Sequence, residues 1–164
     1  MASGKTTTAN LFQQYFPQVH RLSFADPVKQ IATDIFGMTG KNRKLLQEIG
    51  GKMREIDPEV WIKYTIRQAQ QYSDVVIDDV RYLNEINALK DAGFTIIYLE
   101  VTPEQQRDRI LVNYWDDATQ HFERLNHESE QADQYAHLAD HTITAGTLEQ
   151  LTKAIRILIG YDTD

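Results

Sequence analysis

The sequence has no cysteine, no long apolar run and few positive charges among its 164 residues. Without cysteine, disulfide bonds and zinc–thiolate sites are excluded. No apolar run approaches the roughly 20 residues that a membrane-spanning helix needs. The N-terminus also lacks the basic and apolar regions of a secretory signal. These absences predict a cytoplasmic protein without a membrane partner.

The charge balance is acidic, with 17 Lys and Arg against 24 Asp and Glu, which gives a net charge of -7. Duplex binding is driven largely by clustered Lys and Arg, so a nucleic-acid polymer is not an expected partner. A mononucleotide is not excluded, because a small pocket needs only a few local cations.

Length and composition fit a single domain over residues 1–164, with 41% hydrophobic and 25% charged residues. Short apolar strands alternate with helical patterns, which predicts an α/β fold: a three-layer sandwich built on a parallel sheet. The strands are expected at 20–25, 74–78, 95–101 and 141–144, and the helices at 6–16, 27–36, 41–54, 58–69, 83–92, from 103 onward, and at 147–159.

The segment SGKTTT at residues 3–8 is typical of the end of a phosphate-binding loop. Backbone N–H groups at a helix start bind oxyanions, and the helix dipole adds a favourable field. Gly4, Lys5, Thr6 and Thr7 are therefore candidate ATP-binding residues. Lys5 would reach the β- and γ-phosphates, and the Thr6 hydroxyl would bind Mg²⁺. The alternative is an ordinary helix N-terminus rich in small polar residues.

The G-x-x-x-x-G-K-[ST] pattern also needs a glycine that would lie before Met1, and the strand that feeds the loop would lie further upstream. We expect this N-terminal strand to be missing from the chain. Three explanations are open for this missing strand. The start of the chain was assigned too late, the neighbouring strands close up, or a partner chain occupies the position of the strand. Part of the anion-binding loop is then absent, which predicts weak ATP binding and impaired phosphorylation.

Two carboxylates, Asp78 and Asp79, follow the apolar run at 75–77. Open α/β sheets bind ligands at the carboxyl ends of their strands, and a phosphate-loop enzyme needs an acid there to hold Mg²⁺. Adjacent strand residues point to opposite faces, so both cannot face a metal in the same way. Arg81 could meet a phosphate with its planar fork. The alternative is a solvated strand end with a helix cap.

Ordered segments along the chain resemble the deoxynucleoside monophosphate kinases found in bacteriophages and prophages. The resemblance covers residue 3 to about residue 155, and each segment is moderately specific. The segments are FADPVK at 24–29, LQEIG at 46–50 followed by Arg54 and Trp61-Ile62, DVRYLNE at 79–85, and HESE at 127–130.

This resemblance implies a fold similar to adenylate kinase and transfer of the ATP γ-phosphoryl group to a deoxynucleoside monophosphate, with ATP and Mg²⁺ as cofactors. At matching positions, Asp79 would serve Mg²⁺ or the acceptor phosphate, with Asp78 as its neighbour. Asp26, Arg54 and Arg81 would surround the acceptor monophosphate. An alternative role for Asp26 is the N-cap of the helix that begins at Pro27.

A helical lid is expected at 104–131, with Arg107, Arg109 and Arg124 as candidates to stabilise the transferring group. Of these arginines, Arg107 is the one expected to be catalytic, together with Lys5, Asp79 and Arg81. Arg107 and Arg109 diverge by about 200° on a helix, so at most one of them is expected to face the site. A solvated charged helix is the alternative. The segment 145–147 is similar in position to a loop of the wider kinase superfamily whose backbone passes the adenine base, which implies such a role for Gly146. The alternative is a turn into the last helix with Thr147 as its N-cap.

Other functions share parts of this pattern. A dephospho-coenzyme A kinase-like enzyme has the same architecture, although the DVRY string disfavours it. A non-catalytic nucleotide-binding protein that kept the fold is favoured by the incomplete loop and disfavoured by the polar residues downstream. The sequence leaves open the base that is accepted and the oligomeric state, a dimer included.

Overall fold

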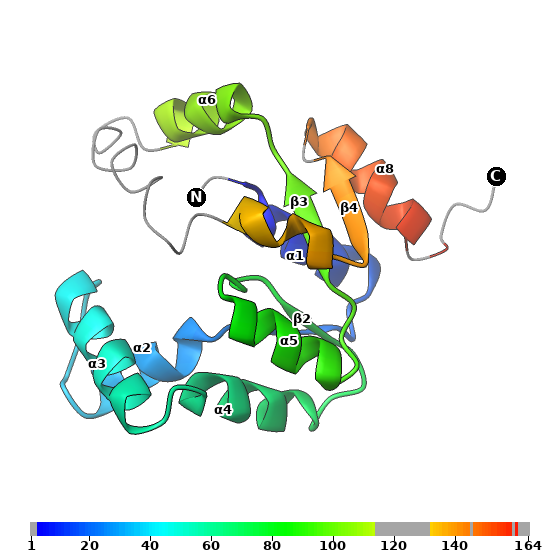
Figure 1. Cartoon of the computed structure of the whole chain (residues 1–164). Coiled ribbons are helices and arrows are strands. Elements are labelled where there is room, and N and C mark those ends of the chain that lie inside the picture. Colours follow the sequence, from blue (N-terminus) through cyan, green and yellow to red (C-terminus); the bar gives the residue numbers. More distant parts are fainter. Residues whose placement is uncertain (1–2, 114–131, 145, 159, 161–164) are drawn as a thin grey trace. The chain divides into compact units, whose positions relative to one another are not determined.

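The computed structural model describes residues 3–113, 132–144, 146–158 and 160 (Figure 1). They belong to two compact units: unit 1 comprises Met1–Pro17 and Arg81–Asp164, and unit 2 comprises Gln18–Val80. Each unit contains one pair of parallel strands together with helices. The expected α/β class with parallel pairing is therefore confirmed, and the three-layer sandwich stays a prediction.

Unit 1 is built on the parallel pair β3 and β4. Ile97 lies opposite His141, and Glu100 opposite Thr144, where the Thr144 hydroxyl donates a hydrogen bond to Glu100 Oε2 at 3.3 Å. The elements of this unit are α1 (Lys5–Tyr15), α5 (Leu83–Asp91), β3 (Ile97–Glu100), α6 (Pro103–Asn113), the 3₁₀ helix η3 (Ala132–Leu138), β4 (His141–Thr144) and α8 (Leu148–Leu158).

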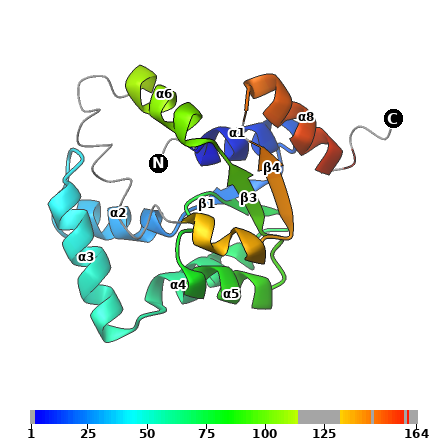
Figure 2. The ribbon, with the colours of Figure 1, turned by 45° about the horizontal axis from the view of Figure 1, so that its top comes forward.

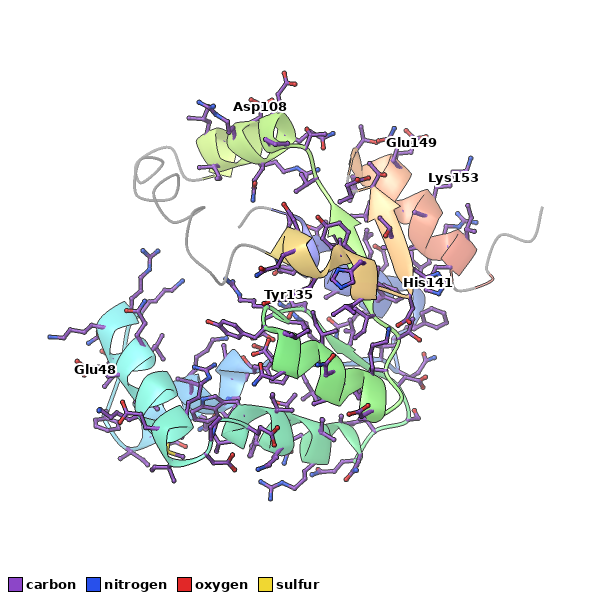
Figure 3. The ribbon with its side chains drawn as sticks, viewed as in Figure 1. Glu48, Asp108, Tyr135, His141, Glu149 and Lys153 are labelled. Atoms are coloured by element: carbon purple, nitrogen blue, oxygen red, sulfur yellow. The ribbon has the colours of Figure 1, made fainter. Side chains whose placement is uncertain are left out.

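The core of unit 1 lies where α1 and α8 pack together and α8 packs on β4 (Figure 1). Its buried members are Leu11, Ile143, Leu151 and Ile155. Full burial of such a side chain contributes about 1.5–3 kcal/mol relative to leaving it exposed. Glu149 and Lys153 are exposed on α8 (Figure 3). The 3.6-residue period thus divides α8 into an apolar and a charged face.

Unit 2 joins the strands β1 and β2 to three helices, and α3 packs against both α2 and α4 (Figure 2). The two strands are parallel, with His20 opposite Val75 and Leu22 opposite Ile77. The buried Trp61 donates its indole N–H to the Gly50 carbonyl at 3.2 Å, which ties α4 to α3. The elements are β1 (His20–Leu22), α2 (Ala25–Asp34), α3 (Arg43–Ile56), α4 (Val60–Ala69) and β2 (Val75–Ile77).

Two expected helix starts differ from the structure. The helix α2 begins at Ala25, so Asp26 lies in its first turn and is not its N-cap, contrary to the interpretation as a cap. The helix α4 begins at Val60 and not at Pro58, because the Asp57 carboxylate accepts a hydrogen bond from the Glu59 N–H and holds residues 57–59 in a turn.

The 3₁₀ helix η3 lies within the polar stretch that showed no sheet pattern. Short 3₁₀ helices have no strong sequence period of their own, which explains why the sequence did not reveal it. Within the described residues, no helix combines the length and apolar character needed to cross a bilayer.

Candidate functional site

The predicted phosphate-loop residues lie at the start of α1. Gly4 has φ +91°, a left-handed conformation that favours glycine, and α1 begins directly after it at Lys5. The Thr8 N–H and hydroxyl both donate to the Gly4 carbonyl, at 2.8 and 2.9 Å. The Lys5 ammonium donates to Ser3 Oγ at 2.9 Å. The loop end therefore leads into a regular helix start, the local geometry that oxyanion binding uses.

Arg109 links the start of α1 to the loop before α8. Its Nη2 donates to the Gly146 carbonyl at 2.7 Å, and a Cβ built on Gly4 would lie 3.8 Å from its Nη1. These residues come from distant parts of the sequence: Gly4 and Gly146 were predicted to bind ATP, and Arg109 was one of the candidate lid arginines. The structure of unit 1 brings these three residues together.

The two arginines on α6 that were candidates for a lid differ in their surroundings. Arg109 is half-buried beside the fully buried Ile110, whereas Arg107 is exposed. The labelled Asp108 is also exposed on this helix (Figure 3). The divergence expected from helical spacing is therefore present, and Arg109, not the favoured catalytic candidate Arg107, lies beside Gly4.

Gly146 occupies a tight position ahead of α8. Its N–H donates to the Thr144 carbonyl at 2.9 Å, and a Cβ added to it would collide with the Gln150 side chain. Gln150 Oε1 accepts the Thr147 N–H at 2.9 Å, while Thr147 Oγ1 accepts the Gln150 N–H at 3.2 Å. This reciprocal cap confirms Thr147 as the N-cap of the last helix.

Asp78 forms an ion pair with Arg21 in unit 2. The guanidinium donates from Nε at 3.2 Å and from Nη2 at 2.6 Å to the two carboxylate oxygens, and the Asp78 side chain is only 7% exposed. Sequence analysis missed Arg21. The signal was an arginine within a short apolar strand, because a cation placed there needs a carboxylate partner.

Asp79 caps α2 from a distant point in the chain. Its Oδ1 accepts the Phe24 N–H at 2.9 Å, and its Oδ2 accepts the Ala25 N–H at 3.0 Å and the Ser23 hydroxyl at 2.6 Å. The expected divergence of Asp78 and Asp79 is thus observed, since their carboxylates have different partners. The capping role that the sequence assigned to Asp26 belongs to Asp79.

The acceptor-side candidates belong to both units. In unit 2, Asp26 is exposed and pairs with Lys29 at 2.8 Å. Arg54 donates from Nη1 to the Gly50 carbonyl at 3.3 Å within α3.

Arg81 opens the second part of unit 1, where its N–H donates to Glu85 Oε2 at 2.7 Å. The same oxygen accepts the Tyr82 N–H at 3.0 Å, and Glu85 is 5% exposed. The glutamate of the DVRYLNE segment therefore caps α5, a structural role that sequence analysis did not assign.

The described residues contain no group of three or more His, Cys, Asp or Glu side chains that could hold a metal ion. Mg²⁺ usually keeps several waters and is bound by one or two carboxylates together with substrate phosphates. Asp78 and Asp79 supply carboxylate oxygens of the kind that Mg²⁺ prefers, but in the structure these oxygens accept hydrogen bonds from Arg21 and from residues 23–25. The Thr6 hydroxyl, the third predicted ligand, is exposed on α1.

Several sequence candidates lie outside the described residues, and the predicted lid at 104–131 is described only to residue 113. They are Arg124, the HESE segment at 127–130, and the aromatic residues Tyr114, Trp115 and Phe122.

No protein-family model matches the chain, and no curated protein matches it either.

Proposed function

We propose that the protein transfers the γ-phosphoryl group of ATP to a deoxynucleoside monophosphate and forms the diphosphate. The observation that carries this proposal is the position of Arg109, which contacts the Gly146 carbonyl and lies beside Gly4. The proposal is supported by the closeness of three residues to which the sequence assigned separate roles: Gly4 in the predicted phosphate loop, Arg109 among the predicted lid arginines, and Gly146 in the loop predicted to pass the base.

The ATP side follows from charge and position. Catalysis of phosphoryl transfer consists almost entirely of positioning and electrostatic stabilisation. Backbone N–H groups at the start of α1, the Lys5 ammonium and the Arg109 guanidinium are the groups that would hold the triphosphate. Thr7 and the Gly146 backbone complete this set, and Arg107 is the second lid candidate. A guanidinium suits the role because its planar fork presents several donors to phosphate oxygens.

The acceptor side is assigned to Asp26, Arg54 and Arg81. An arginine binds a phosphate through two parallel hydrogen bonds, which gives Arg54 and Arg81 their role. Thr6 and Asp78 are the residues that would hold Mg²⁺, and Asp79 would serve either Mg²⁺ or the acceptor. When bound with the nucleotide, Mg²⁺ neutralises the charge that develops on the phosphates.

The proposal is tested by incubating the protein with ATP and Mg²⁺ and, separately, with dTMP, dGMP, dCMP and dAMP. The same panel is run with a form extended upstream of Met1 by a strand and a complete phosphate loop. We expect the extended form to convert at least one monophosphate to its diphosphate. Conversion of none would contradict the substrate assignment.

The panel also separates the alternative functions. Phosphorylation of a coenzyme A precursor alone would move the assignment to the dephospho-coenzyme A kinase type. Thermal stabilisation by a monophosphate without turnover in either form would indicate a non-catalytic nucleotide-binding protein.

A further inference from the structure

We infer that Asp79 is a positioning residue for the acceptor, which it serves by fixing the first turn of α2. This inference rests on the proposed function and assigns one of its residues a more specific task. The carboxylate accepts the backbone N–H groups of Phe24 and Ala25, the two residues that directly precede Asp26. The side chain that holds this turn therefore determines where Asp26 lies.

The hydrogen bonds of Asp79 make a rigid connection between the end of β2 and the start of α2. Bonds from N–H groups to a carboxylate are charge-assisted and roughly twice as strong as neutral ones, and a negative charge is favourable at a helix N-terminus. Ser23 Oγ donates to Asp79 at 2.6 Å and accepts the Ala25 N–H at 3.1 Å, which closes a ring of hydrogen bonds.

Apolar packing holds the other side of the same turn. Phe24 is 4% exposed and Val28 is 8% exposed, and Pro27 is also buried. The Asp26 side chain, in contrast, is 57% exposed. The turn is therefore fixed by the core on one side and by Asp79 on the other, and it presents Asp26 to solvent.

The charge of Asp26 determines which group of the acceptor it could bind. A carboxylate repels a phosphate group and accepts hydrogen bonds from N–H and O–H donors. Asp26 therefore fits a donor on the base or sugar of the acceptor, whereas Arg54 in the same unit fits its phosphate. Positioning errors of about 1 Å at such residues can reduce activity on the order of 100-fold.

Substitution of Asp79 by asparagine distinguishes positioning from metal binding. Asparagine keeps one acceptor oxygen but replaces the other by an NH₂ group. This NH₂ group cannot accept the hydrogen bonds that the second carboxylate oxygen accepts in the unmodified chain. We expect Asp79→Asn to raise the Kd for the preferred deoxynucleoside monophosphate about 10-fold, which corresponds to the loss of roughly one hydrogen bond. The Kd for ATP in the presence of Mg²⁺ should change by less than about 2-fold.

The experiment measures these two constants by calorimetric titration of the full chain and of three variants. Ser23→Ala removes one donor to Asp79 and one acceptor of the Ala25 N–H, leaves the Asp79 carboxylate in place, and guards against a failure of Asp79→Asn to fold. Asp140→Asn is the matched control, because Asp140 also accepts a backbone N–H, that of Ile96 at 2.7 Å, but belongs to unit 1. Amide hydrogen exchange at Phe24 and Ala25 reports the turn directly.

Three results together support the inference: weaker monophosphate binding in Asp79→Asn and Ser23→Ala, faster exchange of the Phe24 and Ala25 amides, and unchanged binding in Asp140→Asn. Unchanged monophosphate binding in both unit 2 variants would overturn it, as would loss of Mg²⁺-dependent ATP binding alone in Asp79→Asn. If the unmodified chain binds no deoxynucleoside monophosphate, both the inference and the proposed function fail. If the unmodified chain binds a deoxynucleoside monophosphate and the Asp79→Asn and Ser23→Ala variants bind it equally well, only the inference is rejected.

Discussion

Arg109 is the residue whose surroundings bear most directly on the proposed ATP site. Its guanidinium bonds the Gly146 carbonyl at one end and lies beside Gly4 at the other. Arg107 is on the same helix, two residues earlier, and is exposed. The pair therefore offers an internal comparison: the same residue type on the same helix, with only one member beside the predicted phosphate loop.

Replacing Arg109 by alanine should weaken ATP binding on the order of 10-fold or more, because the variant loses a cation beside the helix start and leaves the Gly146 carbonyl without this donor. Arg107→Ala should change ATP binding by less than about 2-fold. Titration of both variants with ATP and Mg²⁺ checks the prediction. Equal losses in the two variants would show that α6 contributes only general positive charge.

Among the elements, α3 contains a glycine that the helix does not require. Gly51 lies inside α3, and a Cβ added to it meets nothing within 4 Å. Gly93 follows α5 with φ +84°, and a Cβ there also meets nothing within 4 Å. The two positions have the same open space and differ in backbone conformation.

Gly51→Ala should therefore raise the free energy of unfolding by about 0.5–1 kcal/mol, because alanine lowers the entropy of the unfolded chain and favours the helix. Gly93→Ala should lower it by roughly 1–2 kcal/mol, since a Cβ is strained at positive φ. Urea unfolding of the two variants measures both changes. A loss of stability in Gly51→Ala would mean that α3 needs a glycine there for a reason other than space.

The elements also show what one sequence can predict. Strands and long helices were predicted because their apolar residues recur with a clear period, as at 83–92, where the structure has Leu83–Asp91. The predicted start of α2 was wrong, because Asp26 is a plausible local N-cap for a helix that begins at Pro27. The actual cap, Asp79, lies 54 and 55 residues from the amides it accepts. Contacts over such separations have no local sequence signal.

For the candidate site, residue types were predictable, whereas their partners were not. Gly4 was identified from the Gly-Lys-Thr pattern, and Gly146 from the position that it shares with a loop of the wider kinase superfamily. Which lid arginine lies beside Gly4 depended on the packing of α6, where Ile110 is fully buried. The partner of Asp78, Arg21, depended on the pairing of β1 with β2.

At the scale of the whole molecule, exposed carboxylates with lowered pKa values make stability depend on acid pH. Backbone and side-chain hydrogen bonds hold the pKa of Asp140 below 3.8, with the Ile96 N–H as the largest cause. In unit 2, the bond from Lys63 is the largest cause that lowers the pKa of Asp57. A carboxyl group whose pKa is lower in the folded state stabilises the fold above its unfolded pKa and loses this contribution as pH falls.

We therefore expect the free energy of unfolding to decline as pH falls from about 5 to about 3. The double variant Asp57→Asn/Asp140→Asn should show a shallower decline, because two of the responsible groups no longer titrate. Urea unfolding at several pH values and constant salt measures the slope. An identical slope in the variant would show that other carboxyl groups account for the acid sensitivity.

The central proposal, that this protein phosphorylates a deoxynucleoside monophosphate, is tested most directly by measuring both products of the reaction. The extended form is incubated with ATP, Mg²⁺ and one deoxynucleoside monophosphate, and ADP and deoxynucleoside diphosphate are quantified together. We predict equal amounts of the two products. In Lys5→Ala the rate should fall by at least about 100-fold, since Lys5 would stabilise the charge of the transferring group. The matched control Lys153→Ala, which changes an exposed lysine on α8 (Figure 3), should retain the full rate. ADP formed without any deoxynucleoside diphosphate, or a Lys5→Ala variant as active as the parent, would contradict the account.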